Sequence, residues 1–211
     1  MGALLNRSRT TEQTNMALSF NTNFLVVYNR AVRDIASAHL STIDDSARLF
    51  ALVNLAMTDA VITAWDSKRH FVFWRPAIQD GDNDGNPDTI GDPYWQAFIN
   101  TPNYPSYTSG ANNVTGAATR SLALFFGSDE MSFTLHTTNA AAPVQTRDYN
   151  RFSDVARDVV DVRIFQGIHF RFDDVRARKQ GRHVAQWVFS HFLRPVDADE
   201  SDDHDDGGDD E

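Results

Sequence analysis

Apolar residues recur along most of this chain at intervals of three and four, the spacing of helices with one buried face. The pattern predicts a first helix over residues 15–40 and a second from Thr42 to about Trp65. Asp44 and Asp45 fall in the first turn of the second helix, where acidic side chains interact favourably with the helix dipole. The apolar face of the first helix would consist of Phe20, Phe24, Val27, Ala31, Ile35 and Ala38. The apolar face of the second would consist of Leu49, Val53, Ala56 and Ala60.

The same spacing predicts three further helices, over residues 110–126, 148–166 and 174–193. Before them, residues 75–109 contain five of the chain's seven prolines, which indicates a long loop. Alternation with period two is scarce, so a substantial sheet is not expected. We therefore predict an all-α fold, a helical bundle.

The charges separate a body from a tail. The chain carries 29 acidic and 19 basic residues, but residues 197–211 hold ten of the acids and no Lys or Arg. Without that segment 19 acids face 19 bases, and a neutral body argues against nucleic-acid binding. We predict one domain over residues 1–194 and a disordered acidic tail over residues 195–211, which has too few apolar residues to order itself.

The absence of cysteine and the short apolar runs exclude several kinds of site and segment. The absence of cysteine excludes disulfides, thiolate metal sites and cysteine nucleophiles. Residues 1–9 contain only a three-residue apolar run, which does not indicate a signal peptide. The longest apolar stretch, from Leu49 to Trp65, is interrupted by Asn54 and Asp59 and suits a buried helix better than a membrane span. We expect a soluble protein without membrane contact, cytoplasmic as encoded, with export left open.

Three separate segments carry candidate chemistry, and the first contains two cations, Lys68 and Arg75. If the segment were helical, the seven-residue spacing would place both on one side. The chain has only two lysines among its 19 basic residues, so the compact ammonium at position 68 stands out. A surface position for both cations is the ordinary alternative.

The second segment is a loop that ends in Ser109 and Gly110 where a helix is predicted to begin. A hydroxyl, free backbone N–H groups and the positive end of the helix dipole can together bind an oxyanion, although an ordinary helix cap has the same pattern. The third segment places Arg163 beside the apolar stripe of the helix over residues 148–166. His169 follows at the end of that helix, and Asp173 can orient it or balance its charge.

The order Lys-x6-Arg-Pro, Ser-Gly and Arg-x5-His-x3-Asp resembles the signature of the vanadium-dependent haloperoxidases and the related type 2 phosphatidic acid phosphatases. The stretches DAVITAWDSKRHFVFWRPAI, DGNPDTIGDPYWQAF, GAATRSLALFFG and RIFQGIHFRFD also resemble bacterial haloperoxidase-like members. The resemblance extends from Leu52 to Leu193 and implies a helical bundle of the vanadium haloperoxidase and acid phosphatase type. Known members are longer at the N-terminus, so the chain is expected to be short there, and a homodimer could replace the missing helices.

The resemblance also implies roles for individual residues. Lys68, Arg75 and Arg163 would neutralise the equatorial oxygens of vanadate, or of phosphate in the same site. Ser109 would contribute its hydroxyl and Gly110 its backbone N–H.

His169 would bind vanadium axially, and with Lys68 and Arg163 it would form the catalytic set. The expected cofactor is vanadate and the expected substrates are hydrogen peroxide and a halide. One alternative is a phosphomonoester hydrolase that forms a phosphohistidine at His169, and another is a non-catalytic oxyanion-binding relative.

One position departs from the family pattern. The Ser-Gly pair is usually followed by a histidine that acts as acid–base catalyst, and here that residue is Ala111. A methyl group transfers no proton, and general acid–base catalysis typically contributes about 10²–10⁴-fold. His70 is the nearest substitute by sequence, and Trp65 and Tyr104 are candidates for the pocket wall. The acidic turn at residues 80–85 lacks the glutamate that a calcium loop needs at its twelfth position, so we do not predict calcium binding.

Overall fold

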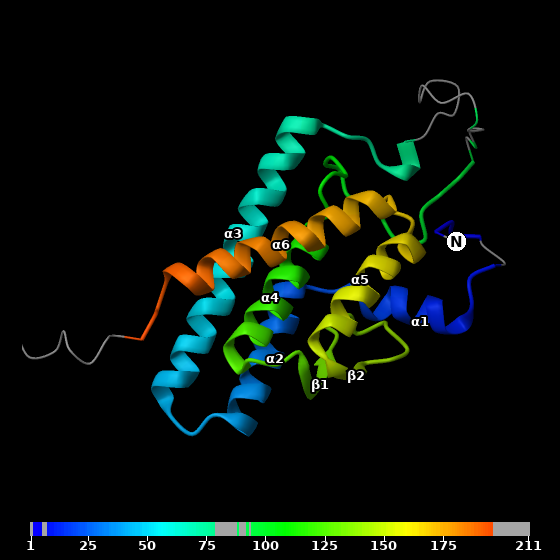
Figure 1. Ribbon diagram of the computed structural model, residues 1–211. Coiled ribbons are helices and arrows are strands. Elements are labelled where there is room, and N and C mark those ends of the chain that lie inside the picture. The colour runs from blue at the N-terminus through cyan, green and yellow to red at the C-terminus, as the bar shows by residue number, and fades with distance from the viewer. Residues whose placement is uncertain (1, 6–7, 79–87, 89–91, 93, 196–211) are drawn as a thin grey trace, which may run out of the picture.

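The computed structural model describes residues 2–5, 8–78, 88, 92 and 94–195. In this part of the chain six α-helices form a bundle, with one short 3-10 helix and one β-hairpin (Figure 1). The helices are α1 (Thr11–Ser19), α2 (Phe24–His39), α3 (Ile43–Phe71), α4 (Gly110–Phe126), α5 (Phe152–Gln166) and α6 (Arg171–His191). The remaining elements are η1 (Pro76–Ile78), β1 (Glu130–His136) and β2 (Thr146–Arg151). The acidic turn at residues 80–85 and the tail from residue 196 lie outside the described residues.

Helix α3 is longer than its apolar pattern predicts. It begins as expected after Thr42, whose hydroxyl accepts a hydrogen bond from the Asp45 N–H. All four residues of its predicted face are buried. It continues beyond Trp65 and ends at Val72, which adopts a left-handed conformation with φ of 45°. Lys68 therefore lies on the last turn of α3, whereas Arg75 follows in the loop, and the two cations do not share a helix.

By length and hydropathy alone, α3 could also cross a membrane. Its buried residues include Leu49, Leu52 and Met57, so in this fold one face of α3 packs against the rest of the bundle. The absence of membrane contact stays a prediction.

The single helix predicted over residues 15–40 is wrong, because two helices occupy this segment. Helix α1 ends at Ser19, and Asn23 starts α2 by accepting hydrogen bonds from the N–H groups of Leu25 and Val26. Most of the predicted apolar face is buried, but Ala38 is exposed. Ala36 takes the buried position one turn after Val32 instead.

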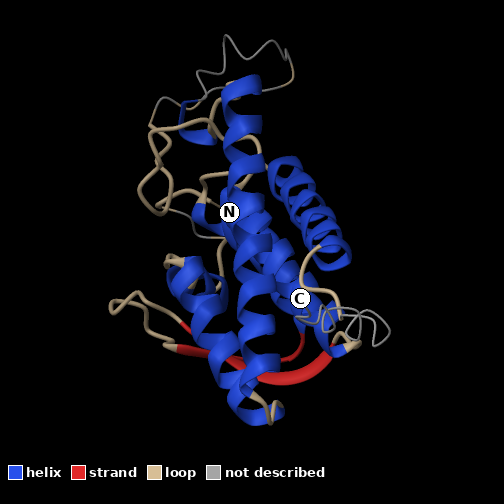
Figure 2. Cartoon of the chain, turned by 90° about the vertical axis from the view of Figure 1, so that its left-hand side faces the viewer, coloured by secondary structure: helices blue, strands red, loops and turns tan. Residues whose placement is uncertain are grey.

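The helix predicted to begin at residue 148 is also wrong at its start. Strand β2 pairs antiparallel with β1, and α5 begins only at Phe152. Tyr149 stacks on Phe133 across the hairpin and turns into the core, which a helix starting at residue 148 would prevent. Asp129 then caps α5 by accepting from the Ser153 backbone and hydroxyl. Figure 2 shows the hairpin at the end of the bundle opposite to the long loop after α3.

Helix α6 crosses α3 and α4, and its contact with α4 depends on two glycines (Figure 1). A Cβ atom added to Gly181 of α6 would lie 2.0 Å from the carbonyl oxygen of Asn113. One added to Gly116 of α4 would lie 2.4 Å from the carbonyl oxygen of Arg178. The backbones therefore touch, and this contact sets the distance between the N-terminal ends of α4 and α6.

We expect Gly181→Ala to lower the free energy of unfolding by about 1–3 kcal/mol, the usual effect of overpacking. In a helix without such a contact, a glycine-to-alanine change would raise the free energy of unfolding by about 1 kcal/mol. The sign of the measured change therefore shows whether the close contact exists. Urea unfolding followed by circular dichroism measures the change in the free energy of unfolding. The control is Gly110→Ala, because no atom lies within 4 Å of the added methyl group there. Stabilisation by Gly181→Ala would contradict the close contact.

Candidate oxyanion-binding site

Lys68 reaches from the last turn of α3 into the loop that precedes α4. Its ammonium donates to the carbonyl oxygens of Pro105 at 2.8 Å and Ser106 at 2.7 Å. Among the described residues its hydrogen-bond partners are these two carbonyl oxygens and no carboxylate, and Lys68 is 2% exposed. A buried ammonium held only by neutral carbonyls can accept a further, anionic partner.

Arg75 lies on the other side of the same loop and is 1% exposed. Its Nε donates to the carbonyl oxygen of Tyr104 at 2.8 Å, and its Nη1 donates to that of Ile168 at 2.7 Å. Nη1 also lies 3.4 Å from Nε2 of His169. The third nitrogen, Nη2, is buried without a hydrogen-bond partner among the described residues.

Arg163, on the last turn of α5, is the third cation. Its Nη1 donates to Oε1 of Gln166 at 2.7 Å. Its Nε, like Nη2 of Arg75, is buried without a partner among the described residues. Arg75 is buried and Arg163 is half-buried, and each keeps one buried N–H donor without a partner among the described residues. Such unpaired donors destabilise the fold, and an oxyanion would satisfy both.

The turn between α5 and α6 places His169 beside these cations. Gly167 ends α5 in the left-handed region, with φ of 76°, a conformation that favours glycine. His169 Nδ1 then lies 3.0 Å from Oγ of Ser106 and 3.2 Å from Oδ2 of Asp173. Asp173 also accepts the N–H of Phe170 at 3.2 Å, which holds the carboxylate at the start of α6.

Burial destabilises the protonated form of each of the three cations and so lowers its pKa. It lowers the pKa of Lys68 to about 7, and the nearby charge of Arg75 contributes to that shift. It lowers the pKa of Arg75 to about 10 and also lowers the pKa of Arg163. An anion bound among the three cations would oppose these shifts.

The imidazole and the two carboxyls of the cluster are shifted toward their neutral forms. Burial and the three cations hold the pKa of His169 well below its usual range, so the ring is neutral at physiological pH. Burial raises the pKa of Asp173, and it raises that of Asp174 well above the usual range. The carboxyls therefore compensate the cations incompletely, and the cluster retains positive charge for a ligand.

The Ser-Gly pair sits at the start of α4 as predicted, but the Ser109 hydroxyl has other partners than expected. It accepts from Nδ2 of Asn112 at 3.3 Å and interacts with the buried carboxyl of Asp174. It makes no capping hydrogen bond to the N–H groups of the first turn. Gly110 and Ala111, rather than the Ser109 side chain, line the adjacent cavity.

A cavity of about 340 Å³ adjoins this cluster. The residues that line it include Trp65, Lys68, Tyr104, Gly110, Ala111 and Arg163. The rings of Trp65 and Tyr104 pack together with centroids 5.0 Å apart, so both aromatic residues lie where the sequence suggested a pocket wall. His70 is exposed and is not among the lining residues, so it does not replace the missing histidine from this position.

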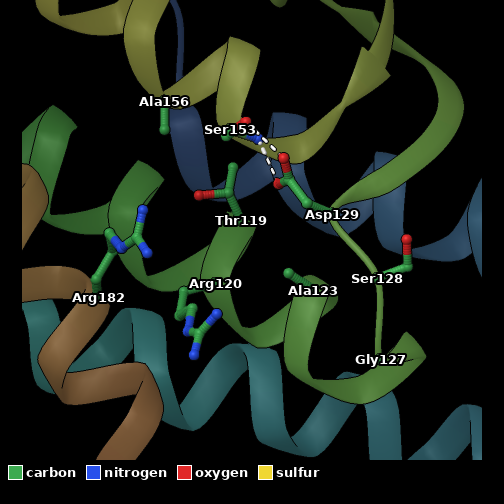
Figure 3. Close-up of a pocket in the computed structure, with 9 residues that line it drawn as sticks. All are labelled: Thr119, Arg120, Ala123, Gly127, Ser128, Asp129, Ser153, Ala156 and Arg182. Atoms are coloured by element: carbon green, nitrogen blue, oxygen red, sulfur yellow. Dashed lines mark hydrogen bonds between the residues drawn. The ribbon is translucent and has the colours of Figure 1, made fainter.

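A second cavity, of about 310 Å³, lies between α4, α5 and α6 and is lined by none of the predicted site residues (Figure 3). Its carboxylate, Asp129, is bound to Ser153 and Arg151. Arg120 donates to Gln186, and Arg182 is exposed. None of the described residues that line it has a buried donor without a partner, so the cluster around Lys68 is the stronger candidate.

Sequence reasoning did not assign two buried residues of the cluster, Ser106 and Asp174. Ser106 lies in the loop that forms the second candidate segment, three residues before the Ser-Gly pair. Asp174 follows Asp173 at the start of α6, where acids are common because of the helix dipole. The signal that separates them from such ordinary positions is complete burial, with both residues 0% exposed.

Comparison with known proteins agrees with this arrangement. A family model described as the VCPO second helical-bundle domain matches residues 48–198. The vanadium chloroperoxidase of Curvularia inaequalis is 30% identical over 204 residues, an alignment that includes 72% of this chain and 33% of that enzyme. These findings confirm the family to which the three motifs pointed.

Solved structures are similar over most of the chain. A structure described as the first bacterial vanadium-dependent iodoperoxidase has a TM-score of 0.73 and 26% identity, over 85% of this chain and 44% of that one. An apo-type bacterial vanadium-dependent chloroperoxidase has a TM-score of 0.69 and 19% identity, over 87% and 46%. The all-α helical-bundle prediction is confirmed. This chain spans about a third of the chloroperoxidase from Curvularia and less than half of the bacterial enzymes.

Proposed function

Because the chain belongs to the family of the VCPO second helical-bundle domain, we propose that its buried cations bind vanadate and that the loaded protein oxidises a halide with hydrogen peroxide. Phosphate would bind in the same place. The observation that carries the proposal is a pair of buried donors, Nη2 of Arg75 and Nε of Arg163, which have no partner in the part of the chain that the structure describes. They belong to two segments far apart in the chain and gather around one histidine.

The donor set fits an oxyanion. Vanadate and phosphate offer oxygens around a central atom and carry negative charge, so they need N–H donors and cations. Lys68, Arg75 and Arg163 supply the cations, and the uncapped first turn of α4 supplies backbone N–H groups. Among the described residues no group of three or more His, Asp and Glu side chains is placed to chelate a metal cation. A single imidazole beside several cations suits an oxyanion better than a bare metal ion.

His169 is the residue that would hold the central atom. Asp173 and Ser106 occupy its Nδ1 side, so Nε2 keeps the lone pair of the neutral ring. Bound vanadate would supply an electrophilic centre that activates peroxide for attack by a halide. The three cations would hold the anion and stabilise its charge, while Trp65 and Tyr104 shape the cavity from which small substrates approach.

The same lone pair supports the second candidate function, phosphomonoester hydrolysis through a phosphohistidine at His169. A neutral imidazole backed by a carboxylate is a competent nucleophile. Ala111 on the cavity wall favours the third candidate, a non-catalytic oxyanion-binding protein, because no proton carrier stands where the family has one. A homodimer stays a prediction.

One set of assays separates these functions. The protein is purified with and without orthovanadate, and halide oxidation and p-nitrophenyl phosphate hydrolysis are measured side by side. Vanadate affinity is measured by isothermal titration. We expect vanadate binding, with halide oxidation only in the loaded protein and with His169→Ala inactive. Absence of vanadate and phosphate binding would refute all three functions, and binding without turnover would select the non-catalytic one.

The pH dependence of anion binding tests the role of Lys68. Sulfate is the probe because its charge does not change over the range in which Lys68 titrates. An anion favours the protonated ammonium, so the Lys68 contribution to affinity stays constant below the free pKa of about 7 and falls as pH rises through it. Above that value the fall is about tenfold per pH unit until the pKa of the bound state is reached.

The other charges facing Lys68 come from Arg75, Arg163, Asp173 and Asp174. Arginines stay protonated throughout this range. The control is Lys68→Met, for which we expect weaker sulfate binding with no fall above pH 7. A flat profile in the wild type would show that the Lys68 charge does not contribute to binding.

A further inference from the structure

Ser106 connects the two sides of the candidate site. Its backbone N–H donates to the carbonyl oxygen of Phe73 at 2.8 Å, and its own carbonyl accepts from Lys68 Nζ at 2.7 Å. The residue is 0% exposed. Its backbone is therefore anchored on both sides, and its hydroxyl is held in one place inside the cluster.

The hydroxyl contacts both members of the histidine–carboxylate pair. Oγ lies 3.0 Å from Nδ1 of His169 and makes a short hydrogen bond to Oδ2 of Asp173. His169 and Asp173 come from the α5–α6 turn and the start of α6, 63 and 67 residues further along the chain. The three polar groups form a closed triangle, since Nδ1 also lies 3.2 Å from Oδ2.

With Asp173 ionised, one arrangement of protons satisfies this triangle. The carboxylate accepts, so the Ser106 hydroxyl donates its single proton to Asp173 and has lone pairs left for His169. Nδ1 of His169 must then carry a proton, which it donates to Oγ and to the carboxylate. On the other side of the ring, Nη1 of Arg75 is a donor 3.4 Å from Nε2. Nε2 is therefore the unprotonated nitrogen.

We propose that Ser106 is a positioning residue, whose hydroxyl holds His169 as the Nδ1–H tautomer with its Nε2 lone pair toward the bound oxyanion. The inference rests on the proposed function for the identity of the ligand. Without the hydroxyl, Nδ1 keeps only the longer contact to Asp173, and the carboxylate loses its closest donor. The ring then gains freedom to rotate and to change tautomer, which removes pre-organisation from the atom that binds the anion.

The test compares Ser106→Ala with the wild type by two measurements. In the first, nitrogen NMR of histidine-labelled protein reports the tautomer, and the His169 signals are identified by their absence from His169→Gln. We expect one protonated Nδ1 and one unprotonated Nε2 signal in the wild type. In Ser106→Ala the two signals should move toward the average of both tautomers. In the second measurement, titration should give about a tenfold loss of vanadate affinity.

Two further variants separate positioning from general stability. Ser19→Ala removes another buried hydroxyl, one that bonds the carbonyl oxygen of Val144 at 2.7 Å, and should change neither measurement. Ser106→Thr restores the hydroxyl and should recover both. Thermal unfolding shows whether each variant is folded.

The outcomes distinguish this inference from the function on which it rests. Unchanged His169 signals in a folded Ser106→Ala protein would overturn the positioning role, whether or not vanadate binds. Altered His169 signals in Ser106→Ala, combined with a wild type that binds no vanadate, would support the positioning of the ring and refute the proposed ligand. A loss of affinity that Ser19→Ala reproduces would overturn the specific role of Ser106.

Discussion

Ala111→His should raise turnover by roughly ten- to a thousand-fold, which is part or most of the usual contribution of general acid–base catalysis. Ala111 is the second residue of α4 and lines the cavity next to Gly110, so a side chain there faces the bound ligand. The wild-type chain has no proton carrier at this place. Steady-state halide oxidation and phosphate-ester hydrolysis measure the gain.

Oxyanion affinity should stay within a few-fold in this variant, because Lys68, Arg75 and Arg163 are unchanged. Ala111→Gln is the matched control, since it adds a polar side chain of similar reach that does not titrate. We expect it to bind vanadate and to gain no activity. If Ala111→His binds vanadate normally and gains nothing in either assay, the missing histidine is not what limits turnover.

Arg163→Met should lower vanadate affinity by about 100-fold. The variant loses a half-buried charge and the buried Nε donor that has no partner among the described residues, and hydrogen bonds to charged groups contribute about 1.5–3 kcal/mol each. Arg163→Lys should have an intermediate effect, because it keeps the charge and loses the planar set of donors. Isothermal titration with vanadate, and separately with phosphate, gives both values.

Arg182→Met is the control for the loss of an arginine. Arg182 is exposed and lines the second cavity, so its removal should leave vanadate affinity unchanged (Figure 3). Thermal unfolding tests whether Arg163→Met stays folded, which matters because Arg163 also compensates the buried Asp174. Equal losses in the two methionine variants would show a bulk charge effect and contradict a specific site.

The two errors at helix boundaries have a common cause. The apolar spacing over residues 15–40 and from residue 148 is compatible with continuous helices. Tertiary partners decide otherwise, since Asn23 caps a new helix and Tyr149 packs across a hairpin. Spacing reports which face of a segment is apolar, and it does not report where a side chain from elsewhere ends the segment.

The sequence by itself determined the helical class, the buried face of α3 and the family, because these depend on local spacing and on short motifs such as Lys-x6-Arg-Pro. It also pointed to the three cations and the histidine of the candidate cluster, since charged groups near apolar stripes are unusual, but not to Ser106 or Asp174. It could not determine their hydrogen bonds. Those depend on the path of the long loop after α3 and on the close crossing of α4 and α6.

Ser106 and Ser109 show the difference most clearly. By sequence, Ser109 in the Ser-Gly pair is the expected ligand and Ser106 is an ordinary loop serine. In the structure the Ser109 hydroxyl interacts with Asp174, and Ser106 contacts His169, 63 residues away in the chain. A hydroxyl contributes according to the acceptor within about 3 Å of it, and only the folded chain decides which acceptor that is.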